Sequence, residues 1–138
     1  MENKRKHLEF IQLTIIRMNV NSFLLKGWAI TLVAALFALA AKDANPRYVM
    51  ISYLVIPSFW ILDGYFISIE GRYRDLYDLV TKKDEVDIDY DMDHRKFAKE
   101  DRTWISGIFS STPLIFYGTS IITTLIVMYL LNAPHTGK

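Results

Sequence analysis

Three long runs without a charged residue constrain the fold of this chain more than any other feature. They cover residues 27–41, 48–62 and 103–134, and nearly all Lys, Arg, Asp and Glu lie outside them. Helices of a soluble domain need a polar face on every turn, so soluble proteins rarely segregate charge in this way. A bilayer core about 30 Å thick is crossed by about 20 apolar helical residues. The sequence therefore predicts an all-α membrane protein with three transmembrane helices.

The boundaries of the predicted segments follow from the flanking polar residues. The spans are expected at 22–41, 48–69 and 113–131. The remaining segments are expected to be an amphipathic, interfacial helix at 1–21, an outer turn at 42–47, a cytoplasmic loop with helical and acidic parts at 70–112, and an outer tail at 132–138. No Pro or Gly interrupts residues 8–26. This favours a nearly continuous first helix, bent around Asn19–Ser22, over a separate interfacial helix.

Basic residues set the expected orientation, because loops rich in Lys and Arg stay in the cytoplasm. Thirteen of the 16 Lys and Arg residues lie before the first span or between the second and third spans. This count includes Lys26, which lies just inside the first span. Only three lie in the outer turn and the tail. The sequence therefore predicts a multi-pass protein with its N-terminus inside and its C-terminus outside, and the lipid bilayer is its first expected partner.

Lys26 and Asp63 are the charges that intrude on the first two spans. Counting from the outer turn, each lies 15 residues into its helix, which is about 22 Å at 1.5 Å per residue. A lone charge at the centre of a transmembrane helix costs about 2.5–3.5 kcal/mol on insertion scales. Two opposite charges at equal depth on neighbouring helices offset that cost. We expect a structural salt bridge, with a proton or cation site at Asp63, or separate snorkelling of both residues, as the alternatives.

Small residues recur along the first span at spacings of four, four and three: Gly27, Thr31, Ala35 and Ala38. In lipid such a face lets two backbones approach closely and promotes helix association. We interpret it as a packing face, used either within the hairpin or between copies. The alternative is that Ala is only a good helix former in an apolar span.

Hydroxyl residues form a mildly polar stripe on the third span: Thr119, Ser120, Thr123 and Thr124. Three interpretations remain open. The hydroxyls bond back to their own helix, contact another helix, or line a water-filled path in an oligomer. Pro113 is typical of a helix start, with Ser111 or Thr112 as the expected cap.

The cytoplasmic loop is predicted to begin as a helical extension of the second span, with Tyr73, Leu76, Tyr77 and Val80 on one apolar face. Residues 81–93 read as extended, and a further helix is expected from residue 94 with Asp93 as its cap. The acidic residues of the extended part are Asp87, Asp89, Asp91 and Asp93. Asp89, Asp91, Asp93 and Glu100 match positions of a calcium-loop pattern, but His94 replaces the glycine that the pattern requires. We expect a solvated acidic linker, and cation binding stays the alternative.

Several function classes find no support in the sequence. The chain has no cysteines, and its three histidines are scattered. No arrangement of nucleophile, base and acid is apparent, so we expect no enzyme, no cofactor and no metal site. Basic and acidic residues are interleaved, and therefore no nucleic-acid partner is expected.

Three blocks of the chain resemble a group of small, mostly uncharacterised bacterial membrane proteins. They are HLEFIQLTIIRMNVNSFLLKGWAITLVAALFALAAKD, FWILDGYFISIEGRYRDLYD and DIDYDMD, and within them NSFLLKGW and LDGYF are the most specific. Members of this group resemble membrane effectors of antiphage defence that occur beside TIR-like proteins. The resemblance implies a location in the bacterial inner (plasma) membrane.

Three spans leave too little protein to enclose a pathway within one copy, so we expect a homo-oligomer. The leading hypothesis is a defence-type effector that permeabilises or depolarises the membrane when a cytoplasmic protein or signalling partner engages the loop. The alternative is a membrane anchor or adaptor that recruits a soluble partner through the loop and conducts nothing.

Overall fold

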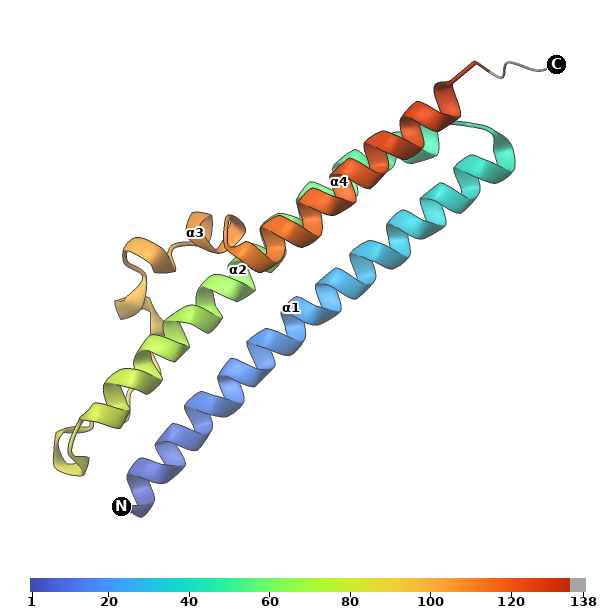
Figure 1. The fold of residues 1–138 in the computed structure, drawn as a ribbon. Helices are drawn as coiled ribbons and strands as arrows, with labels where there is room; N and C mark the ends of the chain where they lie inside the picture. Colours follow the sequence, from blue (N-terminus) through green and yellow to red (C-terminus); the bar gives the residue numbers. More distant parts are fainter. Residues whose placement is uncertain (135–138) are drawn as a thin grey trace.

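The computed structural model describes residues 1–134, apart from the side chain of Glu100, and helices are the only regular elements in this part of the chain (Figure 1). The long helices are α1 (Glu2–Asp43), α2 (Arg47–Lys82) and α4 (Ser111–Asn132). Short elements connect α2 to α4: the 3₁₀ helices η1 (Glu85–Asp87), η2 (His94–Phe97) and η3 (Glu100–Arg102), and the short helix α3 (Trp104–Ile108). The described residues contain no strand. The expected tail at 132–138 lies partly outside the described residues.

Three helices, α1, α2 and α4, are long and apolar enough to cross a membrane. The prediction of an all-helical membrane protein with three transmembrane helices agrees with this architecture. The expected spans at 22–41, 48–69 and 113–131 all fall within these helices. α1 and α2 extend well beyond their apolar parts, and α4 does not.

α1 is a single helix of 42 residues without an interruption at Asn19–Ser22. Figure 1 shows it as a nearly straight rod beside α2, with no sharp bend at these residues. The nearly continuous helix favoured by the sequence is therefore the one observed, and the segment 1–21 is part of it, without the bend expected at Asn19–Ser22. The physical reason is packing, because Ile11 and Ile15 are buried against the extension of α2.

A tight turn joins α1 to α2 close to the expected outer turn. Ala44 adopts a left-handed conformation with φ 48°, and its N–H bonds the carbonyl of Ala40. Such a residue commonly ends a helix by satisfying a free carbonyl. Asn45 then accepts a hydrogen bond of 3.0 Å from the backbone N–H of Arg47, which fixes the start of α2.

Two apolar cores lie along the α1–α2 hairpin. The parts of α1 and α2 that extend beyond the apolar region are called the stalk here. The first core joins these two extensions and consists of Ile11, Ile15, Leu76, Val80 and Ile88. The second lies in the apolar part and consists of Ala29, Val33, Ile56 and Tyr117. The expected apolar face on the α2 extension is confirmed, since its members lie in or against the stalk core.

The connection between α2 and α4 differs from expectation. Asp93 accepts a hydrogen bond of 3.0 Å from the N–H of Arg95, as a cap does, but only one 3₁₀ turn follows it. The helix expected from residue 94 is therefore largely wrong. Lys99 is extended, and Arg72 Nε donates to the Arg102 carbonyl at 2.8 Å. This hydrogen bond holds residue 102 against α2, and the extended Lys99 interrupts any helix between residues 94 and 102.

α3 packs back onto α2 beside Gly64, at the depth that the sequence assigns to the inner end of the second span. Trp60 Nε1 donates to the Ile108 carbonyl at 2.8 Å, and Trp104 Nε1 donates to the Ile61 carbonyl at 2.9 Å. The first bond gives a partner to a carbonyl at the end of α3, and the second adds a donor to a carbonyl within α2, so the two bonds fasten α3 to α2. The segment 70–112 therefore does not lie wholly beyond the second span, because its last part returns alongside it.

Candidate functional site

The charges on α1 and α2 meet where the two helices leave the apolar region. Lys26 Nζ lies 2.5 Å from Asp63 Oδ2 and donates to Ser22 Oγ at 2.7 Å. Ser22 Oγ in turn donates to Asp63 Oδ1. Each carboxylate oxygen thus has a donor, and the structure brings together the two residues that the sequence placed at equal depth. Ser22, one turn before Lys26, is a member that the sequence reasoning missed.

Burial makes this cluster energetically important. Asp63 is 0% exposed, and the Lys26 side chain is only 14% exposed. Removing one partner from such a pair leaves a buried charge uncompensated, which costs several kcal/mol. Tyr117 of α4 is also fully buried, and its ring stacks on Trp60 with the centroids 6.0 Å apart. The Tyr117 hydroxyl has no hydrogen-bond partner among the described residues.

The small-residue face of α1 points away from α2. Gly27, Thr31, Ala35 and Ala38 are all exposed, and a β-carbon on Gly27 would meet nothing within 4 Å. The proposal that this face packs within the hairpin is therefore wrong. The residues that contact α2 instead follow another face of the helix and include Ser22, Leu25, Ala29, Val33 and Ala40. Packing between copies remains a prediction.

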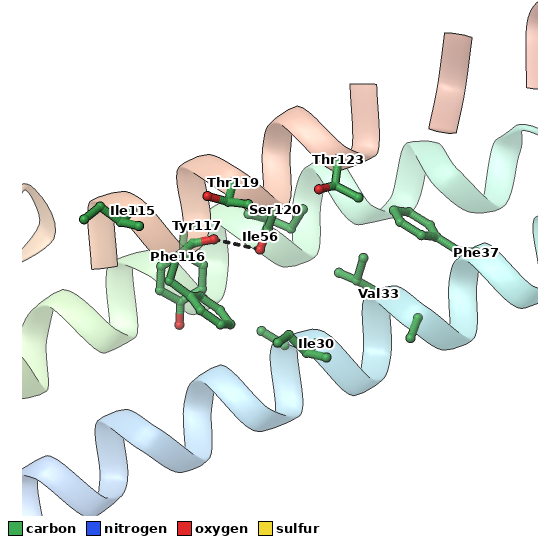
Figure 2. A pocket seen from close by; sticks show the side chains of 12 residues that line it. Ile30, Val33, Phe37, Ile56, Ile115, Phe116, Tyr117, Thr119, Ser120 and Thr123 are labelled. Carbon is green, nitrogen blue, oxygen red and sulfur yellow. Dashed lines mark hydrogen bonds between the residues drawn. The ribbon is translucent and has the colours of Figure 1, made fainter. Parts of the chain in front are cut away.

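The four hydroxyl residues of α4 do not act as one stripe. Ser120 Oγ donates to the Phe116 carbonyl at 2.9 Å, and Thr124 Oγ1 donates to the Ser120 carbonyl at 2.8 Å. These two follow the back-bonding interpretation, and Thr124 is fully buried. Thr119 and Thr123 are exposed. They share one side of α4 with Ser120 and face α1 across an open space (Figure 2).

This open space is an apolar groove of about 480 Å³ between α1 and α4, which we call the α1–α4 groove. Figure 2 shows Ile30, Val33 and Phe37 on one side and Thr119, Ser120 and Thr123 on the other. α4 packs mainly against α2, so its side toward α1 stays open.

A second hollow, which we call the basic cavity, lies nearer the stalk between the same two helices and α2. Its volume is about 370 Å³. The cationic members of its lining are Lys26, Arg74 and Arg102, the carboxylate is Glu70, and the hydroxyls belong to Ser22, Ser110, Ser111 and Thr112. Sequence reasoning missed this cavity, because Arg102 reaches it only after the chain folds back onto α2. The sequence feature that could have indicated this cavity is the presence of Arg72, Arg74 and Arg102 near the ends of the predicted spans.

The start of α4 forms one wall of the basic cavity. The helix begins at Ser111, with Ser110 as its N-cap and no side-chain hydrogen bond to the first N–H groups. The expected cap at Ser111 or Thr112 is therefore wrong by one residue or more, since the helix starts earlier. Ser110 Oγ instead donates to the Gly107 carbonyl at 2.8 Å. The uncapped helix end leaves a partial positive charge facing the cavity.

The acidic residues of the loop are engaged with backbone and basic groups. Asp89 and Asp91 accept from backbone N–H groups two residues ahead, and Asp91 also pairs with Lys96. A hydrogen bond from Arg95 is the main cause that lowers the pKa of Asp93 to about 2. No group of three or more His, Cys, Asp and Glu residues within the described residues is arranged to hold a metal ion.

The fold and this site define a class: an all-helical protein with three helices long and apolar enough to span a membrane, a stalk and a buried charge cluster where the two meet. Comparison with protein-family models, with curated proteins and with solved structures finds no match. Inferences about function therefore rest on the residues and their geometry.

Proposed function

We propose that this protein acts as an oligomer that permeabilises or depolarises the bacterial inner membrane when a cytoplasmic partner or signal engages its stalk. The observation that carries the proposal is the exposed face of Gly27, Thr31, Ala35 and Ala38. A small-residue face in lipid gains energy when a second helix packs on it. No helix within residues 1–134 covers this face, so a second copy is the partner we assign to it.

The loose packing of the apolar region supports the same proposal. Only 17%, 22% and 11% of the residues in the most apolar windows of α1, α2 and α4 are buried. Most of the surface in this region is therefore available to lipid or to other copies. Within one copy the interior is filled by Ile56 and Tyr117, which are about fully buried, so a conducting path requires several copies.

Continuous helices support the coupling of the stalk to the membrane region. α1 and α2 each run from the stalk into the membrane region without a break. The Lys26–Asp63 pair joins the two helices where the stalk meets that region. A partner that displaces the stalk helices would therefore move the spans as well. The resemblance to membrane effectors of antiphage defence agrees with a role in which such a signal triggers leakage.

Membrane potential is the direct test. Cells that express the chain are loaded with a voltage-sensitive dye, and the potential is followed after induction, with and without phage infection as the source of a signal. We expect depolarisation with the wild-type chain and little with Gly27→Leu, which blocks the small-residue face. Ser58→Leu is the matched control, since Ser58 is also small and exposed but lies on α2. Unchanged potential under every condition removes the proposal.

A second candidate function is that of an anchor that recruits a soluble partner and conducts nothing. The loop favours it, because Val86 is 92% exposed although it is apolar and adjoins the stalk core. In that case Val86→Asp abolishes capture of the partner, while replacement of the spans by unrelated ones preserves it. The effector proposal predicts instead that replacing the spans by unrelated ones abolishes the activity.

A further inference from the structure

We propose that the protein binds one phospholipid of the cytoplasmic leaflet, with the lipid phosphate in the basic cavity and an acyl chain in the α1–α4 groove. The two hollows lie between the same pair of helices, and each matches one part of a lipid. This lipid site does not depend on the permeabilising activity proposed above.

The chemistry of the basic cavity fits a phosphate group. Lys26, Arg74 and Arg102 contribute three positive charges to its lining, and each is paired with a carboxylate: Asp63, Glu70 or Asp75. A phosphate would therefore bind through the N–H donors that these pairs leave free, not through an excess of positive charge. Hydroxyl groups and the uncapped start of α4 add neutral donors and a partial positive charge. Basic pockets between transmembrane helices on the cytoplasmic side are typical sites for anionic lipid headgroups.

Each cation of the cavity has donors left for a ligand. Arg74 binds Glu70 through Nε and Nη2, and Arg102 binds Asp75 through Nε and Nη2. A guanidinium group carries five N–H donors, so these contacts leave others unused. Their existing partners hold both guanidinium groups in place, which lowers the ordering cost of binding a phosphate.

The depth of the cavity also fits a headgroup. Arg74 lies 26 residues from Tyr48 along α2, which is beyond the roughly 20 residues that cross a bilayer core. Glu70 and the start of α4 lie near the same level. Lys26 lies 11 residues nearer the outer turn than Arg74, which is about three helical turns deeper, and its Nζ faces the ring of Phe116 at 6.0 Å from the centroid. The cavity therefore lies where the phosphates of the cytoplasmic leaflet are expected.

The groove begins where the cavity ends. On α1 the cavity uses residues 19–26 and the groove uses 29–37, while on α4 the cavity uses 110–112 and the groove uses 115–123. The groove spans nine residues of each helix, a rise of about 12 Å over eight steps of 1.5 Å. Its lining is mostly apolar, so it accepts a hydrocarbon chain that continues from a headgroup in the cavity.

Charge complementarity favours a lipid over a helix of a second copy. The anions of α2 at this level are Asp63, Glu70 and Asp75, and each is already paired with one cation of the cavity. A second copy carries the same pairs, so its α2 would bring no unpaired anion from these positions to Lys26, Arg74 and Arg102. A phospholipid supplies both the anion and the hydrocarbon.

Native mass spectrometry of the full chain in detergent tests the lipid site. The protein is titrated with dioleoylphosphatidylglycerol, with dioleoylglycerol, which lacks the phosphate, and with glycerol 3-phosphate, which lacks the chains. We expect one tightly retained phosphatidylglycerol and at least tenfold weaker retention of the other two compounds. Equal binding of dioleoylglycerol overturns the phosphate assignment, and equal binding of glycerol 3-phosphate overturns the lipid as the source.

Two pairs of variants locate the site. Arg74→Gln is expected to weaken phosphatidylglycerol binding about five- to tenfold, since one basic residue near the membrane surface contributes about that factor. Arg95→Gln is its control, because Arg95 is also paired with an adjacent carboxylate but lies outside the cavity. Thr123→Phe fills the groove and is expected to weaken binding, whereas Ile122→Phe, on an exposed side of α4 outside the groove, is not. Equal losses within either pair overturn the assigned position.

Discussion

Gly107 of α3 lies directly against Gly64 of α2. A β-carbon on Gly107 would stand 2.1 Å from the carbonyl oxygen of Gly64, and one on Gly64 would stand 2.4 Å from a side-chain carbon of Ile108. The two backbones therefore approach as closely as glycine alone permits. The indole bonds of Trp60 and Trp104 cross the same contact in opposite directions. This contact fixes where α4 begins and thus places Ser110–Thr112 in the wall of the basic cavity.

Gly107→Ala is expected to destabilise the protein by about 1–3 kcal/mol, because an added methyl group overpacks a contact with no free space. Gly27→Ala is the control, since its β-carbon meets nothing within 4 Å and alanine favours a helix by up to about 1 kcal/mol. Thermal unfolding in detergent, followed by tryptophan fluorescence, measures both. Equal unfolding temperatures for Gly107→Ala and the wild type would contradict the close contact.

Lys26→Met is expected to destabilise the protein by about 3–5 kcal/mol, because it leaves the buried Asp63 carboxylate without its cation. The double change Lys26→Asp with Asp63→Lys restores opposite charges at the same positions and should recover part of the loss. Lys6→Met is the matched control. Lys6 pairs with Glu2 on the exposed side of α1, where such a pair contributes less than about 1 kcal/mol.

The charge swap is the decisive comparison for this pair. Chemical denaturation in detergent compares the wild type, the single changes Lys26→Asp and Asp63→Lys, the double variant and the two methionine variants. If the double variant is no more stable than either single change, the two side chains do not stabilise each other. An effect of Lys6→Met as large as that of Lys26→Met would show that burial does not distinguish the pairs.

Acid is expected to loosen the stalk through His7. Its ring is 5% exposed and lies edge-on to Tyr90, with centroids 5.4 Å apart. Burial lowers the pKa of His7 below 6.5, and the nearby Asp89 and Asp91 only partly oppose this shift. The unfolded stalk therefore binds more protons than the folded one just below pH 6.5. Stability is complete above that pH and falls as the pH drops through it.

Hydrogen exchange of the stalk at pH 7.5 and pH 5.5, corrected for the intrinsic effect of pH, measures this change. His7→Phe keeps the aromatic contact and should make the pH dependence shallower. His94 contributes in the same direction, because burial and the charge of Arg72 lower its pKa as well. A pH dependence that is unchanged in His7→Phe would exclude His7 as its source.

The cysteine-free chain allows a direct test of topology. We expect Asn132→Cys to react in intact cells with a maleimide that cannot cross the inner membrane, because the C-terminus is predicted outside. Val86→Cys, which is 92% exposed in the loop, should react only after the cells are broken. Protein gels of the labelled samples give the readout. Labelling in the opposite order would reverse the orientation and move the basic cavity to the outer leaflet.

The Lys26–Asp63 contact shows how far counting along a sequence reaches. Helices rise by a fixed amount per residue, and a short turn forces α1 and α2 to be neighbours, so equal depth can be read from the sequence. Ser22 was missed because depth says nothing about which neighbouring hydroxyl completes the cluster. The small-residue face shows the opposite case, since spacing identified a face but not the direction in which it points.

By itself, the sequence determined the class of fold: uncharged runs of the length of a bilayer specify spanning helices, and the flanking charges place their ends. The route of residues 94–110, the groove beside α4 and the assembly of Lys26, Arg74 and Arg102 into one cavity were decided only by the tertiary structure. The physical reason is that hydrophobic length acts within one segment, whereas these features depend on contacts between segments far apart in the chain, such as Gly64 with Gly107 and Asp75 with Arg102.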